Sequence, residues 1–251
     1  MPAFPPAAQD VRERRTVLVT GGSGGIGRAL CLAFAHAGCW VGVHYFRQRP
    51  AAEQTLALLS QAGGQGALYQ ADVRSSHEVQ AMLDAIRAQR GRLDTLLCNA
   101  GIASKHLVVN CPEEAWQQII DTNPTGTYRC MTAAVNDMMT QGGGSIVVIG
   151  SFAGLQGTNG QAAYAASKAG LIGLVKTAAR EWGPLNIRVN MVCPGWQQTR
   201  IAGDSFPTGD RLDDHVLGRV SNLADVSRTI CQLAQLSDMS GQVWNLDSRI
   251  L

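Results

Sequence analysis

Short apolar runs alternate along the chain with longer segments in which apolar residues recur every three or four positions. Runs of the first kind are typical of buried strands, and segments of the second kind are typical of helices that cover them. A regular alternation of the two predicts an α/β fold built on a parallel sheet with helices on both faces. Seven strands are expected, at residues 16–20, 40–45, 67–70, 95–98, 145–150, 187–192 and 242–246.

A glycine-rich turn, TGGSGGIG at residues 20–27, directly follows the first expected strand. Thr20 and Gly21 close the strand, and Gly25 and Gly27 open a helical pattern. Because glycine has no side chain, the backbone N–H groups at the positive end of this helix can approach a pyrophosphate closely. The turn therefore predicts a dinucleotide site in a Rossmann-type, doubly wound sheet, with its cleft at the C-terminal ends of the strands.

A second chemical pattern joins Tyr164 and Lys168, which are four residues apart in a helical segment, to Ser151 at the end of the apolar run SIVVIGS. Residues four apart share a helix face, so the ammonium can lie beside the phenol. A free tyrosine has a pKa of about 10, and a fixed positive charge moves this pKa toward neutral pH. The pattern indicates acid–base chemistry.

These motifs resemble the short-chain dehydrogenase/reductase family, and the resemblance extends from about Thr16 to the C-terminus. Phrases such as AAYAASKAGLIGLVKTAARE and IRVNMVCPG are most similar to the 3-oxoacyl-carrier-protein reductases. The pieces that carry the resemblance are the glycine-rich turn, Asp72 in ADV, Asn99-Ala100-Gly101, Asn123 in DTNPTG, Ser151, Tyr164 with Lys168, and Pro194-Gly195 with Thr199.

The resemblance implies catalytic roles for four residues. Tyr164 would exchange a proton with the substrate oxygen, Lys168 would lower the pKa of Tyr164 and hold the nicotinamide ribose, Ser151 would stabilise developing charge, and Asn123 would hold a water in a proton relay. Ser151, Tyr164 and Trp196 are the expected substrate contacts. The expected cofactor contacts are Thr20, Gly21, Ser23, Gly25, Ile26, Gly27, Tyr45, Arg47, Asp72, Val73, Asn99, Ala100, Gly101, Tyr164, Lys168, Pro194, Gly195 and Thr199.

The residues after the second strand bear on the choice of cofactor. Members of the family that use NAD carry an Asp at this strand end, where it binds the adenosine ribose and repels a 2′-phosphate. This chain has Tyr45 there, followed by Phe46, Arg47, Gln48 and Arg49. The missing acid and the two nearby guanidiniums favour NADP(H) over NAD(H). Arg47 as a solvated loop residue without a ligand is the alternative.

Composition narrows the functional class only slightly. The 251 residues are 45% hydrophobic and 16% charged, with a net charge of +2. Binding of nucleic acid or anionic membrane therefore has no electrostatic support. Seven cysteines without a C-x-x-C pair favour reduced thiols in the cytoplasm, and no metal site is expected. We expect one catalytic domain over residues 1–251, with a flexible tail at residues 1–15.

Two expected long helices, at residues 113–140 and 161–182, suggest self-association. Their apolar positions, including Trp116, Ile120, Leu171 and Val175, exceed what one sheet face can cover. The family pairs these helices across a two-fold axis, which implies a homodimer or a homotetramer. Tetramers of the family add a contact through the last strand, where the usual D-G-G ending is replaced by Asp247-Ser248-Arg249.

The sequence leaves the substrate open. An NADPH-dependent reductase for a 3-oxoacyl or related keto substrate is favoured, with an alcohol dehydrogenase working in the oxidative direction as the alternative and a non-catalytic nucleotide-binding scaffold as the third reading. A carrier-protein partner has weak support, because glycines 142–144 and residues 183–185, GPL, stand where basic residues are common in relatives that use carriers. The segment after Gly195 is expected to be a variable lid.

Overall fold

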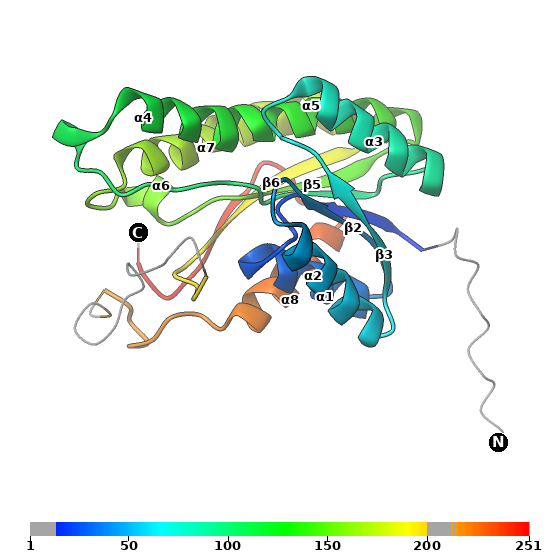
Figure 1. Cartoon of the computed structure of the whole chain (residues 1–251), viewed down its shortest axis with the longest axis horizontal. Helices are drawn as coiled ribbons and strands as arrows, with labels where there is room; N and C mark the ends of the chain where they lie inside the picture. The colour runs from blue at the N-terminus through cyan, green and yellow to red at the C-terminus, as the bar shows by residue number, and fades with distance from the viewer. Residues whose placement is uncertain (1–13, 200–211, 213, 251) are drawn as a thin grey trace, which may run out of the picture.

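A computed structural model describes residues 14–199, 212 and 214–250 and contains one seven-stranded sheet. All strands are parallel, in the order β3-β2-β1-β4-β5-β6-β7, as expected for a doubly wound α/β fold (Figure 1). The strands are β1 Thr16–Val19, β2 Trp40–Tyr45, β3 Gln65–Gln70, β4 Thr95–Cys98, β5 Gly144–Ile149, β6 Ile187–Pro194 and β7 Val243–Leu246.

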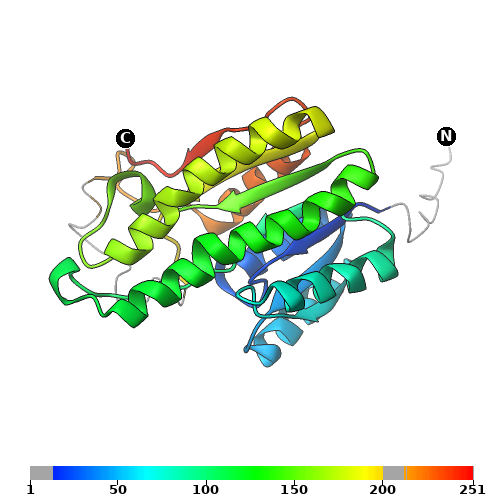
Figure 2. The same ribbon diagram turned by 90° about the horizontal axis from the view of Figure 1, so that it is seen from above.

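Helices cover both faces of the sheet, as Figures 1 and 2 show. One face carries α1 Gly25–His36, α2 Arg49–Gln61 and α8 Leu223–Gln235. The other carries α3 Ser76–Arg90, α4 Glu113–Ile120, α5 Gly126–Thr140 and α7 Ala162–Trp182. The short elements are η1 Val108–Asn110, η2 Asp121–Thr125, α6 Ala153–Gln156 and η3 Gly183–Leu185.

Two apolar cores hold the three layers together. Phe34 of α1 and Leu59 of α2 belong to the core on one side, and Met131 of α5 and Leu171 of α7 belong to the core on the other. All six residues of β2 are buried, as are all four of β1 and β4, because helices cover the sheet from both sides. This explains why the strands appear in the sequence as continuous apolar runs rather than as alternating patterns.

Two helices begin with residues that favour a helix N-terminus. Pro50 lies in the first turn of α2, where its missing N–H costs no hydrogen bond. The Ser75 side chain accepts a hydrogen bond from the N–H of Glu78 at 3.2 Å and caps α3. Glu78 does not form a capping box with Ser75. Its carboxylate instead accepts from the N–H of Asp72 at 2.8 Å, so the cap also fixes the end of β3.

The helix expected at residues 113–140 is interrupted in its middle. Between α4 and α5 the backbone widens into the π-helical turn η2, which contains Asn123 and Pro124. Proline lacks an N–H and crowds the preceding turn, so a regular α-helical pattern cannot pass through this point. The widened turn places Asn123 in the interior, where it is fully buried.

The apolar positions expected on the surface of the long helices divide into two groups. Leu171 and Val175 are fully buried against the sheet, so the expectation that they add to an uncovered surface is wrong. The amphipathic face of α7 is satisfied within the chain. Trp116 of α4 is exposed at 39% and Tyr128 of α5 at 52%, so α4 and α5 carry the uncovered apolar side chains.

Two sequence expectations concern segments that the structure describes only in part. The tail expected at residues 1–15 lies outside the described residues except for Arg14 and Arg15, and the segment expected to form the lid lies outside them at residues 200–211 and 213. Six of the seven cysteines are buried and all seven are unpaired, consistent with reduced thiols. Among the described helices none has the length and apolar character needed to cross a membrane.

Candidate active site

A cleft opens where the strands β4, β5 and β6 end. Its lining includes residues from the glycine-rich turn, the ends of the three strands, α7 and the C-terminal segment. The expected site residues that line it are Ile26, Asn99, Gly101, Ser151, Tyr164, Lys168, Pro194, Gly195, Trp196 and Thr199.

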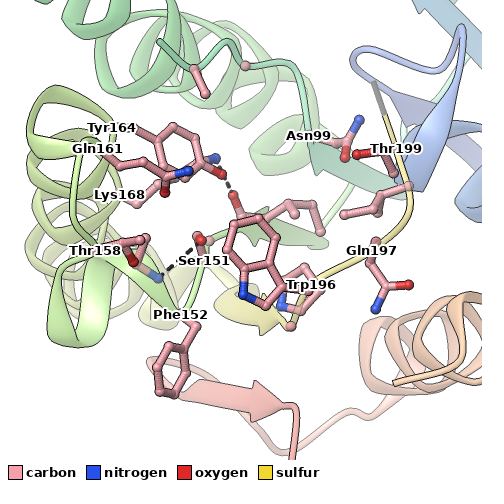
Figure 3. Close-up of a pocket in the computed structure, with 18 of the residues that line it drawn as sticks. Asn99, Ser151, Phe152, Thr158, Gln161, Tyr164, Lys168, Trp196, Gln197 and Thr199 are labelled. Atoms are coloured by element: carbon pink, nitrogen blue, oxygen red, sulfur yellow. Dashed lines mark hydrogen bonds between the residues drawn. The ribbon is translucent and has the colours of Figure 1, made fainter. Parts of the chain in front are cut away.

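Tyr164, Lys168 and Ser151 come together inside this cleft (Figure 3). Tyr164 and Lys168 lie one turn apart on α7, and the Lys168 Nζ is 5.7 Å from the centroid of the Tyr164 ring. Lys168 is 5% exposed, and its Nζ donates a hydrogen bond of 2.7 Å to the carbonyl oxygen of Ile149 at the end of β5. The Ser151 Oγ accepts from the N–H of Ala153 at 3.2 Å, which fixes the hydroxyl at the start of α6.

Burial dominates the electrostatics of this group. It raises the pKa of Tyr164, and hydrogen bonding from Ser151 opposes the rise. Burial also lowers the pKa of Lys168 to about 8. Ser151 is the group whose hydrogen bond favours the Tyr164 phenolate, while the Lys168 ammonium is directed to the Ile149 carbonyl. The influence of Lys168 on the pKa of Tyr164 stays a prediction.

Asn123 lies beside this group but its side chain has a structural task. Its Oδ1 accepts from the N–H of Ile102, and its Nδ2 donates to the Ile102 carbonyl and to the Ser167 hydroxyl, all at 2.9 Å. The amide thereby ties the loop after β4 to α7. The backbone carbonyl of Asn123 accepts from the N–H of Gly126 in the π-helical turn and keeps a second lone pair. This carbonyl is the group that a relay water would use.

The glycine-rich turn is shaped by close backbone contacts. Gly21 has a φ of +65°, a region that glycine adopts without strain. A Cβ on Gly27 would lie 2.1 Å from the Gly21 carbonyl oxygen and 2.7 Å from Nδ2 of Asn99. Asn99 itself donates to the carbonyl oxygens of Thr20 and Gly21 at 3.0 and 3.1 Å. Helix α1 therefore approaches the sheet as closely as its backbone allows.

The start of α1 fits the pyrophosphate of a dinucleotide. Its N-cap is Gly24, which supplies no side-chain cap, and the first turn contains no acidic residue. A Cβ on Gly24 would meet nothing within 4 Å, so the space in front of the helix end is open. The first N–H groups of the helix are thus available to an anion.

Some expected cofactor residues lie behind the cleft rather than in it. Thr20 is 1% exposed, and its hydroxyl donates to the Leu97 carbonyl and accepts from the N–H groups of Asn99 and Ala100. Val73 is buried against Gly126 of α5. These two side chains act on a cofactor only by holding the strand ends in place.

The end of β2 presents two guanidiniums to solvent, although not the pair expected. Arg47 and Arg74 lie over the Phe46 ring. Their Cζ atoms are 4.8 Å and 5.6 Å from its centroid. Arg49 instead pairs with Glu53 along α2 at 2.9 Å. Tyr45 is buried and occupies the position where an Asp would repel a 2′-phosphate.

Asp72, an expected cofactor contact, is paired with Arg74 at 2.6 Å. Hydrogen bonding from Arg74, more than the nearby Arg47, holds the pKa of the Asp72 carboxyl below its usual range. Arg74 was missed from the sequence because it follows Asp72 in the loop after β3, far from the second strand in the chain. Pairing with Arg74 reduces the repulsion that Asp72 would exert on a phosphate.

His44 is a further residue that the sequence did not reveal. It is 2% exposed, its Nδ1 accepts from the N–H of Gly21 at 2.9 Å, and its Nε2 lies 2.9 Å from the Ala71 carbonyl. Its own carbonyl accepts from the N–H of Gly22 at 2.8 Å. Burial lowers the pKa of His44, which favours the neutral ring that this pattern requires. A histidine within an apolar strand is usually a core residue, so no sequence signal marked it.

The substrate end of the cleft adds residues from distant parts of the chain. Trp196 lines the cleft as expected, and Figure 3 places it between Ser151 and Gln197. The lining residues that sequence reasoning missed are Ile149, Gly150, Phe152, Ala153, Ala103, Thr158, Gln161, Gln197 and Arg249. Their side chains meet only because the loops after four strands converge.

Comparisons with known proteins agree with this geometry. The family model of the short chain dehydrogenases matches residues 15–209. A 3-oxoacyl-[acyl-carrier-protein] reductase FabG of Staphylococcus aureus is 37% identical over 223 residues, which cover 88% of this chain and 90% of that protein. A short-chain type dehydrogenase/reductase from Mycobacterium ulcerans superposes with a TM-score of 0.87 at 28% identity, covering 93% of this chain and 88% of that one.

An NAD⁺-bound xylitol dehydrogenase superposes with a TM-score of 0.86 at 26% identity, covering 93% of this chain and 98% of that chain. The chain therefore belongs to the short-chain dehydrogenase/reductase family. It is an NAD(P)-dependent oxidoreductase that acts on CH–OH or C=O groups.

Proposed function

We propose that this protein is an NADPH-dependent carbonyl reductase that acts on a 3-oxoacyl or related keto substrate. The observation that carries the proposal is the meeting of Tyr164, Ser151 and Lys168 in one cleft that also receives the glycine-rich turn. The similarity to a 3-oxoacyl reductase favours the keto substrate. A scaffold without catalysis would not require these three polar groups in this arrangement.

Each residue has a distinct task in the proposed reaction. When bound, reduced nicotinamide supplies a hydride to the carbonyl carbon. The Ser151 hydroxyl donates a hydrogen bond to the carbonyl oxygen as negative charge develops there. Tyr164, whose raised pKa keeps the phenol protonated at neutral pH, transfers its proton to that oxygen and completes the alcohol.

Lys168 and Asn123 restore the proton. The pKa of Lys168, lowered to about 8, allows it to exchange a proton close to neutral pH. A water on the Asn123 carbonyl would link Lys168 to solvent through the widened turn η2. Thr199 and the first turn of α1 would hold the cofactor phosphates, since a Cβ on Gly25 would lie 3.0 Å from the Thr199 methyl group.

The test is a steady-state assay of the full-length chain with NADPH against 3-oxoacyl thioesters, small ketones and quinones. Loss of nicotinamide absorbance with at least one keto thioester or ketone supports the proposal. Absence of turnover across the panel, with NADPH binding demonstrated by titration, would refute it.

Oxidation of an alcohol is the second candidate function. The observation in its favour is the structural likeness to a xylitol dehydrogenase bound to NAD⁺. In this direction an ionised Tyr164 would accept the proton, which its raised pKa makes harder at neutral pH. A higher pH optimum for oxidation than for reduction would therefore be expected.

For the cofactor, we infer a preference for NADP(H) from Tyr45, Arg47 and Arg74. The two guanidiniums over Phe46 can pair with a 2′-phosphate, and Tyr45 carries no charge to repel it. NAD(H) remains the alternative to be compared by titration.

We also propose that the chain is a homodimer or a homotetramer in the cytoplasm. The exposed Trp116 and Tyr128 on α4 and α5 support a symmetric contact, and the free thiols support a reducing compartment. A carrier protein stays a weakly supported partner. Light scattering at micromolar concentration tests the assembly: a fully active species of 26.7 kDa would exclude it.

A further inference from the structure

Arg249, near the C-terminal end of the chain, returns to the cleft and lines it. Its Cζ lies 3.6 Å from the centroid of the Phe152 ring, a stacking contact that guanidiniums favour. Its Nε donates to Oδ2 of Asp247 at 2.8 Å, and its Nη2 contacts the same oxygen. Its Nη1 lies 3.8 Å from the exposed Asp214 and makes no hydrogen bond within the described part of the chain. One edge of the guanidinium is thus held by Asp247, and the other forms a long ion pair with Asp214 and is available for a hydrogen bond.

The charged side chains that line the described part of the cleft are both cations. Lys168 and Arg249 are the charged residues in the described lining, which contains no Asp or Glu. Asp247 is fully buried and does not line the cleft. Lys168 lies beside Tyr164 at the reaction centre, whereas Arg249 lies beyond Phe152. A second cation far from the acid–base pair has no task in the reduction itself.

Phe152 sets the distance between the two cations. It follows Ser151 directly in the chain, and Figure 3 shows its ring pointing away from Tyr164. The Arg249 guanidinium stacks on that ring, so it lies beside the side chain that follows Ser151 and not at the Tyr164 phenol. A molecule whose carbonyl oxygen contacts Ser151 and Tyr164 would reach Arg249 only with a group several bonds away.

Resting on the proposed reductase function, we propose that Arg249 is a specificity-determining residue for keto substrates that carry a carboxylate several bonds from the carbonyl. The carboxylate accepts hydrogen bonds from the available edge of the guanidinium. Asp247 and Phe152 hold that guanidinium in place before the substrate binds, so little side-chain entropy is lost on binding.

A purely structural explanation of Arg249 makes different predictions. If the guanidinium only neutralises the buried Asp247, its removal should lower thermal stability and affect charged and neutral substrates alike. If it binds a substrate carboxylate, its removal should raise KM for the charged substrate and leave the neutral one nearly unchanged. The comparison of two substrates in one variant separates the two roles.

The experiment uses methyl ketones with a carboxylate two to five methylene groups from the carbonyl, each paired with its methyl ester, and NADPH. The wild-type chain should prefer at least one acid over its ester by about tenfold in kcat/KM. Arg249→Met should abolish that preference through KM, and Arg249→Lys should keep part of it. Arg228→Met, which removes an exposed arginine on α8, is the matched control. It should change neither the preference for the acid nor KM.

Two results would overturn the inference. One is a wild-type enzyme that reduces acids and esters equally well at every chain length. The other is an unchanged preference for the acid in Arg249→Met or, should that variant not fold, in Arg249→Lys together with Arg249→Gln. Both leave the reductase function intact, whereas failure to reduce any ketone or thioester at all would refute the proposed function instead.

His44 supports an independent inference about the other end of the cleft. Its ring joins the N–H of Gly21 to the carbonyl of Ala71, and its backbone carbonyl holds the N–H of Gly22. Gly21 belongs to the glycine-rich turn, and Ala71 directly precedes Asp72. One buried side chain thus connects the region expected to bind the pyrophosphate with the region expected to bind the adenine.

The two hydrogen bonds define one form of the ring. Nδ1 must accept from the Gly21 N–H, and Nε2 must donate to the Ala71 carbonyl. Both are satisfied only by the neutral ring with its proton on Nε2. Loss of the acceptor would leave the Gly21 N–H unsatisfied. The turn is tightly packed here, because a Cβ on Gly27 would lie 2.1 Å from the Gly21 carbonyl oxygen.

We propose that His44 is a positioning residue that holds the glycine-rich turn in its cofactor-binding shape through the Nδ1 acceptor. Asparagine and glutamine distinguish this from simple core packing. The Asn oxygen can occupy the place of Nδ1 and accept from Gly21, whereas the Gln amide nitrogen can occupy the place of Nε2 and donate to Ala71.

The test measures the dissociation constants of NADPH and NADH by titration of the full chain. For whichever cofactor binds the wild type more tightly, His44→Leu and His44→Gln should raise Kd by about tenfold, and His44→Asn should stay within about threefold. Thermal unfolding of each variant reports packing separately. Equal losses of affinity in the Asn and Gln variants, or an unchanged Kd in His44→Leu, would overturn the assignment.

Discussion

The two ends of the cleft are built in different ways. At the cofactor end, the glycine-rich turn, Asn99 and His44 contact one another mainly through backbone groups, and an added methyl group on Gly27 would strike a carbonyl oxygen at 2.1 Å. At the substrate end, Phe152, Trp196 and Arg249 meet through side chains from loops far apart in the chain.

The two ends therefore tolerate substitution to different degrees. Backbone contacts leave almost no freedom for substitution, so the cofactor end retains a single shape. Side chains on converging loops can change one at a time without disturbing the sheet, which suits the selection of different substrates. The acid–base group lies between these ends, on α7 and after β5, and belongs to the rigid part. Substitutions in the acid–base group should therefore change turnover, those at the cofactor end should change cofactor affinity, and those at the substrate end should change substrate selectivity.

The largest effect is expected at the acid itself. Tyr164→Phe keeps the ring and removes the transferable proton, so turnover should fall by roughly 10²–10⁴-fold. The Kd of the cofactor should change little, because the glycine-rich turn is untouched. Steady-state kinetics together with cofactor titration measure both. A variant with near-native turnover would show that another group supplies the proton.

Gly27→Ala should weaken cofactor binding more than it lowers turnover. The added methyl group must displace the Gly21 carbonyl or α1, at a cost of about 1–3 kcal/mol, and the displaced turn should weaken cofactor binding by about tenfold or more. Gly173→Ala on α7, where an added methyl group meets nothing within 4 Å, is the control and should bind cofactor normally. Equal behaviour of the two variants would contradict the close-contact account of the turn.

Arg47→Ala tests a smaller contribution at the exposed edge of the cofactor end. If Arg47 pairs with the 2′-phosphate, the preference for NADPH over NADH should narrow by about 1–3 kcal/mol. Arg49→Ala is the matched control, because Arg49 is also exposed but pairs with Glu53. Titration with both cofactors decides the point: equal affinities for NADPH and NADH in the wild type would refute the expected selectivity.

The fold could be predicted from the sequence because its signals are local. Every expected strand is present, with ends shifted by two residues at most, since buried parallel strands give uninterrupted apolar runs. The helix expected at residues 113–140 contains Pro124, which a regular helix interior does not accommodate, and the structure shows a π-helical turn there. The burial of Leu171 and Val175 was not predictable from the sequence, because it depends on which face of α7 meets the sheet.

The candidate site could be predicted only as far as its motifs extend. Tyr164, Lys168 and Ser151 are at a fixed spacing, so their meeting followed from one helix and one strand end. Arg249 and Phe152 are far apart in the chain and meet only after the sheet has formed. Arg74 and His44 carried no local signal either. The pairing of Lys168 with the Ile149 carbonyl depends on burial that no spacing reveals.

The smallest expected effect concerns the buried charge of Lys168. Its folded-state pKa of about 8 is below the ordinary value of 10.5, so between these values the unfolded chain binds more protons than the folded one. The free energy of unfolding contributed by this residue should therefore rise with pH, by about 1 kcal/mol between pH 8 and 9.

The buried thiols act in the opposite direction, since their pKa values are raised on folding and the unfolded chain loses their protons first. Only the difference between the wild type and Lys168→Met isolates the lysine. Urea unfolding of both chains at pH 8 and pH 9 measures this difference, which should grow in favour of the wild type as the pH rises. A pH-independent difference would mean that Lys168 keeps its ordinary pKa, and that the cleft is more hydrated around α7 than its burial indicates.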